Sequence, residues 1–423
     1  MGKRIVITSL GSYGDVNPYV GLALGLQARG HAPVIATSPY YSGYVEGAGI
    51  EFRPVRPDLD PHDRELVRRI MDPGKGSEFI VRELILGALR ESYADLSDAV
   101  RGADAILTHP VTFAGPIVAR KTGLPWLSTV LAPMSFVSAH DLPVFPPLPW
   151  AKRLERVPGA AAALVRMARG ASRSWGEPVY ALRRELGLPP GGDPVFEGQH
   201  SPGGVLALFS RVLAEPQPDW PPGVRITGAI PWDGAGARPA LSPALAAFLE
   251  DGPPPVVFTL GSSAVGAAGR FYDESLQAVR RLGVRAVLLA GRHAENRPRG
   301  PLPAGVIVEE FAAHSSLFPR AAAIVHQGGA GTLHAALRAG RPTLVVPFAH
   351  DQPDNAWRVE RLGVSRTLRP PRYRAARAAR ELRTLLDDPR YAARAAEVGA
   401  RVGAEDAVAA ACDAIEARLA AGA

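Results

Sequence analysis

The sequence contains a single cysteine, Cys412, and only four lysines, at positions 3, 75, 121 and 152. One cysteine excludes an internal disulfide and a metal cluster built on cysteine ligands. No apolar run approaches the roughly 18–20 residues that a membrane span requires. The apolar stretch at the N-terminus is too short for a signal peptide. We therefore expect a cytoplasmic protein.

The formal net charge is +7, and nearly all of the positive charge is arginine. Together with abundant alanine, glycine and proline, this skew is typical of GC-rich coding. Attraction to anionic substrates or to a membrane surface stays open. No basic block is interleaved with aromatic residues, so nucleic-acid binding is not expected.

Apolar, β-branched segments alternate with helical patterns along the chain. In the first half, strands are predicted at 4–10, 31–37, 103–108 and 125–130. A helix is predicted to begin at Pro18, because proline is favoured in a first helical turn, and to end just before Gly30. A second series contains strands at 255–260, 286–289, 306–308, 322–325 and 343–346. This rhythm predicts an α/β fold with two doubly wound, Rossmann-like domains and a cleft between them.

The Pro/Gly-rich stretch at 231–245 is the best candidate for a linker. It separates an N-terminal domain over 1–230 from a C-terminal domain over 246–400, each near the usual size of a domain. The final residues, 401–423, are predicted to form a helix that returns to the N-terminal domain.

Residues 324–355 carry the strongest functional signal, IVHQGGAGTLHAALRAGRPTLVVPFAHDQPDN. A buried strand ends at His326 and leads through glycines into a helix. Glycines let a phosphate approach the backbone closely. The free N–H groups at the start of the helix and the helix dipole favour an anion. His326 would donate to a phosphate oxygen and stabilise a leaving group.

A second strand delivers Asp351 and Gln352 beside this loop. Carboxylate and carboxamide groups suit contacts to vicinal hydroxyls. The alternative is that an acidic residue caps the next helix, which fits Asp354 better than Asp351. A ligand with a phosphate end and a polyhydroxyl end satisfies both halves. The stretch therefore predicts a nucleotide-sugar site.

With these residues in place, the chain resembles inverting, nucleotide-sugar-dependent glycosyltransferases of the two-domain GT-B fold, glycosyltransferase family 1. The likeness covers essentially the whole chain. GSYGDVNPYVGLALGLQARGH, from Gly11, resembles the bacterial rhamnosyltransferase and sterol glucosyltransferase branch. LSTVLAPMSFVSAHDLP, from Leu127, and SPGGVLALFS, from Ser201, resemble the catalytic subunit of rhamnolipid-forming rhamnosyltransferases.

The resemblance implies an N-terminal acceptor-binding domain and a C-terminal domain that binds the nucleotide-sugar donor. His326 would contact the diphosphate, and Asp351 and Gln352 the sugar hydroxyls. Phe311 would stack on the nucleobase. The other donor-binding positions are Gly14, Ser262, Ser263, Gly328, Gly329, Ala330, Gly331 and Thr332.

One donor-binding position departs from the family. Many members have Glu two residues after the loop threonine, where it binds the ribose hydroxyls, and this chain has His334 there. The change weakens the case for strict recognition of a ribose 2′-hydroxyl. A UDP-sugar and a dTDP-sugar both stay open as donors.

Transfer to a hydroxyl needs a proton acceptor. Relatives often place a histidine in the first loop, where this chain has Asp15. A carboxylate is ordinarily a weaker base than imidazole, but an oxocarbenium-like transition state permits late proton loss. Asp15 could instead cap the first helix. Relatives pair their base with a residue after a later strand, so we expect Asp15 to pair with His109, and either residue could be the base.

Acceptor specificity is expected around 55–95 and 131–175. Apolar side chains there favour a lipophilic small molecule over a sugar polymer, although a core helix would show the same pattern. The candidate acceptor-binding residues are Phe79, Met134, Phe136, His140 and Phe145. A lipophilic acceptor would also allow peripheral contact with a membrane.

No Asp-x-Asp motif lies near the donor site, so we expect metal-independent transfer with no cofactor besides the nucleotide-sugar co-substrate. A dinucleotide-dependent oxidoreductase is disfavoured because the first loop, GSYGDV, is not GxGxxG. A nucleotide-sugar epimerase or hydrolase of the same fold stays the alternative. His326, Asp351 and Asp15 argue against a silent binding protein. A monomer and a homodimer are both open.

Overall fold

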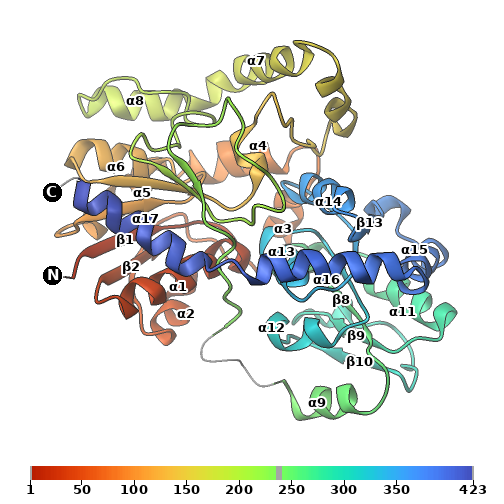
Figure 1. The fold of residues 1–423 in the computed structure, drawn as a ribbon. Helices are drawn as coiled ribbons and strands as arrows, with labels where there is room; N and C mark the ends of the chain where they lie inside the picture. The colour runs from red at the N-terminus through yellow and green to blue at the C-terminus, as the bar shows by residue number, and fades with distance from the viewer. Residues whose placement is uncertain (1, 235–240, 422–423) are drawn as a thin grey trace. The chain divides into compact units, whose positions relative to one another are not determined.

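The computed structural model describes residues 2–234 and 241–421. These residues group into two compact units (Figure 1). Unit 1 comprises Met1–Asp60, Lys75–Trp232 and Asp406–Ala423, and unit 2 comprises Pro61–Gly74 and Asp233–Glu405. Part of the predicted linker, 235–240, lies outside the described residues.

Unit 1 is built on a parallel sheet with the order β3-β2-β1-β4-β5-β6-β7. Its strands are β1 (Arg4–Thr8), β2 (Ala32–Thr37), β3 (Glu51–Pro54), β4 (Ala105–Thr108), β5 (Trp126–Val130), β6 (Val205–Ala207) and β7 (Val224–Ile226). Its α-helices are α1 (Tyr13–Ala28), α2 (Ser42–Gly47), α4 (Gly76–Phe79), α5 (Leu89–Ala99), α6 (Ala114–Thr122), α7 (Ala160–Ser172), α8 (Glu177–Glu185) and α17 (Ala407–Ala421). The central strands are continuous apolar runs because helices cover both faces of a parallel sheet.

Unit 2 repeats this plan with the strand order β10-β9-β8-β11-β12-β13. Its strands are β8 (Val256–Thr259), β9 (Ala286–Leu289), β10 (Val306–Glu309), β11 (Ala323–His326), β12 (Thr343–Val345) and β13 (Ser365–Thr367). Its α-helices are α3 (Arg64–Ile70), α9 (Pro243–Glu250), α10 (Gly261–Ala264), α11 (Phe271–Leu282), α12 (His314–Leu317), α13 (Ala330–Arg338), α14 (Gln352–Arg361), α15 (Ala375–Asp387) and α16 (Pro389–Gly403). The predicted α/β class with two Rossmann-like sheets is confirmed.

The first helix begins earlier than the sequence predicted. Helix α1 starts at Tyr13, and Pro18 lies inside it. Ser12 is the N-cap, and the carboxylate of Asp15 accepts a hydrogen bond from the Ser12 backbone N–H at 2.8 Å. This reciprocal capping box sets the helix start, and it outweighs the preference of proline for a first turn.

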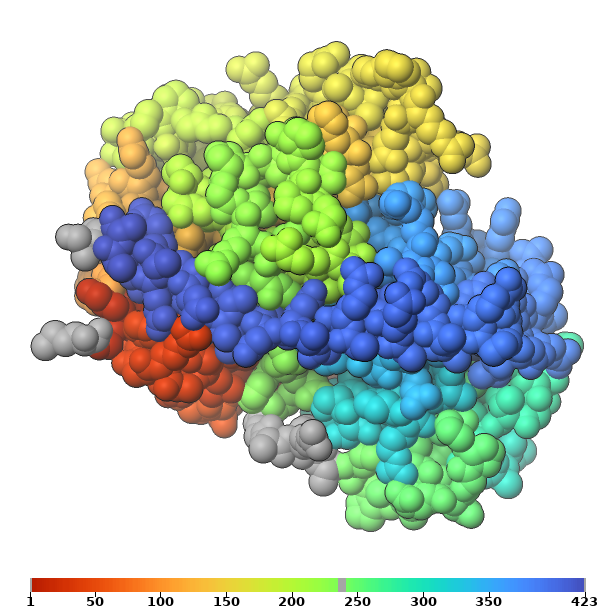
Figure 2. Space-filling view, viewed as in Figure 1, coloured from red at the N-terminus to blue at the C-terminus, as the bar shows by residue number. Residues whose placement is uncertain are grey.

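The final helix, α17, belongs to unit 1 and lies beside α1. Figure 2 shows its dark-blue surface against the red N-terminal elements. Gly25 permits the close approach, since a Cβ there would lie 2.3 Å from Val408 Cγ1. Cys412 and Ile415 of α17 are fully buried. Their apolar burial holds α17 on unit 1.

A segment of the N-terminal half lies in unit 2. The predicted N-terminal domain, 1–230, included Pro61–Gly74, but this stretch and its helix α3 group with unit 2. Val67 and Met71 are buried in the apolar core of that unit. A Cβ on Gly266 would lie 2.9 Å from Val67 Cγ1, so the helix packs closely on the backbone there.

Each sheet has one point at which the strand order reverses. It lies between β1 and β4 in unit 1, and between β8 and β11 in unit 2. Open α/β sheets bind ligands at the carboxyl ends of the strands at such switch points. The predicted residues Asp15 and His109 follow β1 and β4, while Ser262 and His326 lie at the ends of β8 and β11.

Candidate active site

The structure brings Asp15 and His109 together at the switch point of unit 1. Asp15 Oδ1 lies 3.6 Å from His109 Nε2. The side chain of Asp15 is 36% exposed, whereas that of His109 is only 8% exposed. An incoming hydroxyl can therefore reach the carboxylate more readily than the imidazole behind it.

Neighbouring groups hold His109 in place. Its backbone N–H donates to the Thr8 carbonyl at 3.0 Å, and its carbonyl accepts from the Thr112 hydroxyl at 2.6 Å. Tyr19 packs edge-on against the ring, with centroids 5.8 Å apart. Nδ1 is buried and has no hydrogen-bond partner among the described residues. Nε2 is thus the ring nitrogen that faces Asp15.

Asp15 also caps its helix. Its Oδ2 accepts from the Ser12 backbone N–H at 2.8 Å and from the Ser12 hydroxyl at 3.2 Å, while Oδ1 faces His109. Gly14, predicted to bind the donor, lies in the same turn and donates its N–H to the Ser12 hydroxyl at 3.2 Å. The two oxygens of one carboxylate therefore serve the cap and the imidazole together.

Backbone strain lies next to the predicted site residues. Among the described residues, three non-glycine positions have positive φ: Val111 at 62°, Val137 at 46° and His350 at 57°. Val111 follows His109 closely, Val137 follows Phe136, and His350 precedes Asp351. Such conformations cost about 1–3 kcal/mol each and tend to cluster at functional sites.

The glycine-rich loop of unit 2 presents an open helix N-terminus. Gly329 is the N-cap of α13 and makes no side-chain capping bond. Helix geometry leaves the N–H groups of Ala330 and Gly331 without an intrahelical acceptor. Gly331 is exposed, and a Cβ there would meet nothing within 4 Å. The loop therefore has free donors and space for an anion.

His326 is buried beneath this loop as a neutral imidazole. Burial, reinforced by the nearby His314, lowers the pKa of His326 to about 3. Its Nδ1 accepts the Gly328 N–H at 3.0 Å, which places the proton on Nε2. Nε2 is buried and lacks a partner among the described residues. A phosphate oxygen can use this donor only if neighbouring groups move aside.

The loop after β8 packs against the glycine-rich loop. A Cβ on Gly261, which has φ +62°, would lie 2.3 Å from Gln327 Nε2 and 3.2 Å from the hydroxyl of the buried Thr332. The partly exposed Ser262 and Ser263 follow directly. Gln327, which the sequence reasoning did not single out, has a buried Oε1 without a partner among the described residues.

Asn355 joins the two halves of the donor motif. Its side-chain amide donates to the Gly328 carbonyl at 2.9 Å and to Asp351 Oδ2 at 2.8 Å. Asn355 was not predicted from the sequence, although its position four residues after Asp351 on a helix is a usable signal. Asn355 therefore fixes the Asp351 carboxylate relative to the glycine-rich loop.

Helix α14 begins about one turn before Asp354, the residue that the sequence favoured as its cap. Asp351 occupies the N-cap position without a capping bond, and Asp354 lies inside the helix, fully buried and paired with Arg358 at 2.7 Å. Gln352 is 3% exposed, and its Oε1 accepts the Phe348 N–H at 2.8 Å. The Gln352 oxygen therefore holds the loop, which leaves Nε2 as the group suited to donate to a sugar hydroxyl.

His334 turns towards its own helix. Its Nδ1 lies 2.7 Å from the Ala330 carbonyl, and burial lowers its pKa to about 4. Phe311 has the opposite character, because 62% of its surface is exposed. A large aromatic with this exposure is available to stack on a base.

The predicted acceptor residues fall into two groups. Phe79 and Phe136 are buried, each 7% exposed. Phe136 stacks on Trp220 with ring centroids 4.2 Å apart and belongs to an apolar core cluster of unit 1. Met134 and Phe145 are half-buried, and His140 is exposed.

Among the described residues, no helix is both long and apolar enough to cross a bilayer. No three or more His, Cys, Asp or Glu side chains among them group as ligands for a metal ion. Metal-independent transfer stays a prediction.

The fold places the chain in a known structural class, the GT-B architecture of two Rossmann-like sheets. The spinosyn forosaminyltransferase SpnP superposes with a TM-score of 0.75 at 20% identity, covering 99% of this chain and 100% of that one. Glycosyltransferase VinC, solved in complex with dTDP, gives 0.70 at 20% identity over 98% of this chain and 99% of its own.

Sequence comparison then gives the family. Residues 5–134 match the glycosyltransferase family 28 N-terminal domain, where family 1 was expected, and 276–416 match the erythromycin biosynthesis protein CIII-like C-terminal domain. O-mycaminosyltylonolide 6-deoxyallosyltransferase of Streptomyces fradiae is 33% identical over 98% of this chain and 97% of its own length. A sterol 3-beta-glucosyltransferase of Aspergillus fumigatus is 30% identical over 97% of this chain, which spans only 29% of that enzyme. The chain therefore belongs to the glycosyltransferase family of the Streptomyces fradiae 6-deoxyallosyltransferase, and it is a glycosyltransferase.

Proposed function

We propose that the chain is an inverting glycosyltransferase of the rhamnosyltransferase and sterol glucosyltransferase-like branch. It moves a hexosyl or deoxyhexosyl group from a UDP- or dTDP-sugar to a hydroxyl of a lipophilic small molecule. The observation that carries this proposal is the placement of two different polar groups at the two switch points. One is a carboxylate–imidazole pair, Asp15 and His109, and the other is an open helix N-terminus at Gly329.

The donor half of the proposal rests on unit 2. The diphosphate binds the free N–H groups at the start of α13, where the helix dipole and Gly331 favour an anion. Asp351, held by Asn355, and the Gln352 amide bind the sugar hydroxyls. Phe311 stacks on the base. A relative named as a deoxyallosyltransferase and a similar fold solved with dTDP support a dTDP-deoxysugar as one donor class.

The acceptor half rests on unit 1. The acceptor oxygen attacks the anomeric carbon as the bond from that carbon to the β-phosphate oxygen breaks. The acceptor proton passes to Asp15, and the nucleoside diphosphate leaves with the bonding electrons. Asp15 is assigned as the base because its carboxylate is more exposed than the ring of His109. His109 orients the carboxylate and stabilises its charge.

Relatives named O-mycaminosyltylonolide 6-deoxyallosyltransferase and sterol 3-beta-glucosyltransferase support a lipophilic acceptor. Half-buried Met134 and Phe145 stay candidates for its apolar contact. A cytoplasmic location, peripheral membrane contact through such an acceptor, metal-independent transfer and a monomeric or homodimeric state are further parts of the proposal that need their own measurements.

The test is transfer from a panel of UDP- and dTDP-sugars to hydrophobic alcohols, followed by mass spectrometry and NMR of the product. We expect a glycoside whose anomeric configuration is opposite to that of the donor. Retention of configuration would refute inversion. Release of free sugar or epimerised nucleotide-sugar, without any glycoside from the panel, would favour the hydrolase or epimerase alternative.

A further inference from the structure

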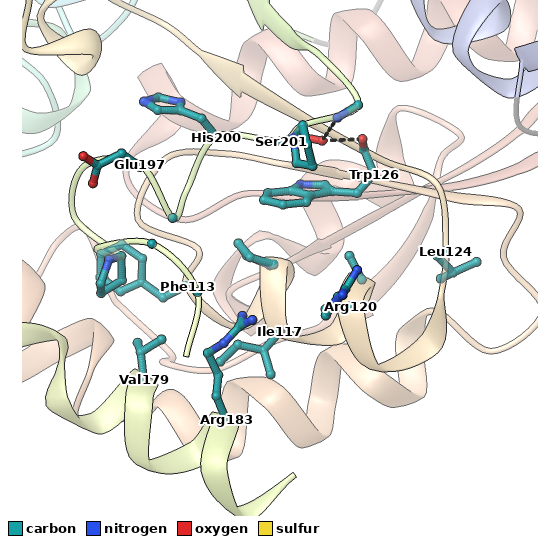
Figure 3. A pocket seen from close by; sticks show the side chains of 18 of the residues that line it. Phe113, Ile117, Arg120, Leu124, Trp126, Val179, Arg183, Glu197, His200 and Ser201 are labelled. Carbon is teal, nitrogen blue, oxygen red and sulfur yellow. Dashed lines mark hydrogen bonds between the residues drawn. The ribbon is translucent and has the colours of Figure 1, made fainter. Parts of the chain in front are cut away.

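Unit 1 contains a pocket of about 510 Å³ that includes neither Asp15 nor His109 (Figure 3). It is bounded by α6, α8 and the loop that precedes β6. Its apolar wall includes the side chains of Phe113, Ile117, Trp126 and Val179. A concave, largely apolar surface of this size is typical of a small-molecule site.

The pocket is distinct from the switch point of unit 1. Leu124 and Gly203 in its lining precede β5 and β6, so they lie at the amino ends of those strands. Asp15 and His109 follow the carboxyl ends of β1 and β4. The Trp126 indole N–H donates to the Thr108 hydroxyl at 2.9 Å, which fixes the ring that lines the pocket.

Three arginines line the pocket without an acidic partner. Arg120 comes from α6, Arg183 from α8 and Arg418 from α17, and no carboxylate among the described residues forms an ion pair with them. The carboxylate in the lining, Glu197, is paired with Arg169. Figure 3 shows Arg120 and Arg183 extending from their helices towards the pocket.

The backbone is shaped around two of these guanidinium groups. Arg183 Nε donates to the Pro189 carbonyl at 2.7 Å. A Cβ on Gly191, which has φ +80°, would lie 3.0 Å from Arg183 Cζ. A Cβ on Gly203 would lie 2.9 Å from Arg418 Nε. Both glycines therefore give a guanidinium room at the pocket wall.

Electrostatics favours an anion at this position. Burial and the nearby positive charge of Arg120 both lower the pKa of Arg183. Arg183 is partly buried and Arg120 is exposed. Their like charges repel, and an anion placed between them relieves the repulsion and accepts hydrogen bonds from their N–H groups. The apolar wall beside them favours a hydrophobic body on the same ligand.

We propose that this pocket is a second binding site for an amphipathic organic anion, with an aromatic or aliphatic body against Trp126 and Ile117 and a carboxylate on Arg120 and Arg183. The proposal is independent of the proposed donor and acceptor chemistry. It predicts a ligand that binds unit 1 without displacing a nucleoside diphosphate.

The experiment is calorimetric titration of the full-length chain with 4-phenylbutanoate and with its neutral isostere, 4-phenylbutanamide. We expect the carboxylate to bind at least about tenfold more tightly than the amide, as loss of a charge-assisted hydrogen bond implies. Arg183→Gln and Arg120→Gln should each weaken the carboxylate by about tenfold or more and leave the amide unchanged.

Arg184→Gln is the matched control, because Arg184 neighbours Arg183 on α8 but pairs with Glu177 at 2.7 Å. It should change the affinity less than about twofold. Thermal melting of each variant checks folding. Equal binding of acid and amide, absence of binding by the acid, an equal effect of Arg184→Gln, or competition by dTDP would each overturn the proposal.

Discussion

The two switch points hold groups of opposite electrostatic character at equivalent places in the fold. In unit 1, the N-terminus of α1 is closed by the Ser12–Asp15 capping box, and a half-exposed carboxylate faces His109. In unit 2, the N-terminus of α13 begins at Gly329 without a side-chain cap, above a fully buried, neutral His326. A capped helix start with a carboxylate suits proton transfer, and an open one suits an anion.

The largest expected effect is a loss of catalysis when the carboxylate at the switch point of unit 1 is removed. Asp15→Asn keeps the size of the side chain but removes the charged base, so we expect kcat for transfer to fall by about 10²–10⁴-fold. Ser12→Ala is the matched control, since it removes the N-cap hydroxyl and keeps the carboxylate. It should lower stability by about 0.5–2 kcal/mol and leave kcat within a few-fold.

Two outcomes would revise the roles in this pair. Full activity of Asp15→Asn would reduce Asp15 to a helix cap. A His109→Ala variant that loses much more activity than Asp15→Asn would make His109 the base and Asp15 its positioning residue. With Asp15 as base, we expect the His109→Ala effect to be the smaller of the two.

Acidification is expected to destabilise unit 2 more than unit 1. Burial lowers the pKa of three histidines in unit 2, His314 and His334 to about 4 and His326 to about 3. Unfolded histidine titrates near 6.5, so below that pH the unfolded chain binds protons that the folded unit does not. This part of the stability is fully present above pH about 6.5 and is lost as the pH falls towards the folded values.

Hydrogen exchange resolved by peptide, between pH 7 and pH 5, is the measurement. After correction for intrinsic rates, peptides of β11 and α13 should lose more protection than those of β1 and β4. Among the residues of unit 1 that the structure describes, one histidine is comparable: burial lowers the pKa of His200 to about 4. Equal loss of protection in both units would contradict the asymmetry.

A smaller effect is expected at His334, which bonds back to its own helix. His334→Glu restores the carboxylate that many relatives have, and we expect the ratio of kcat/KM for UDP- over dTDP-sugars to rise a few-fold. His334→Gln is the neutral control. An unchanged ratio in the glutamate variant would limit this residue to holding α13.

Local patterns predicted what local physics decides. The predicted strands are continuous apolar runs, whereas the short strands β3, β6, β7 and β13 were not predicted. The loop at His326 could be recognised because its glycines, histidine and threonine are close together in the sequence. The predicted start of α1 was wrong, because the capping box of Ser12 and Asp15 outweighs the preference of Pro18 for a first helical turn.

Non-local packing accounts for the remaining differences. Phe136 packs against Trp220, and Val67 and Met71 are buried in the core of unit 2. These contacts join residues far apart in the sequence, so no local pattern predicts them. Asn355 was within reach of the sequence, as the fourth residue after Asp351. Its bond to the Gly328 carbonyl needed the structure.

The central claim is that the open helix start of unit 2 binds the diphosphate while Asp15 acts on the proton alone. Calorimetric titration with dTDP and UDP tests it on wild type, Asp15→Asn and Gly331→Asp, with Gly331→Asn as the neutral control. Gly331 is exposed with open space around it, so the new carboxylate fits the fold but repels the phosphates. We predict at least about tenfold weaker binding for Gly331→Asp, and an unchanged affinity for Asp15→Asn. Unchanged binding in Gly331→Asp, or an equal loss in Asp15→Asn, would contradict the account.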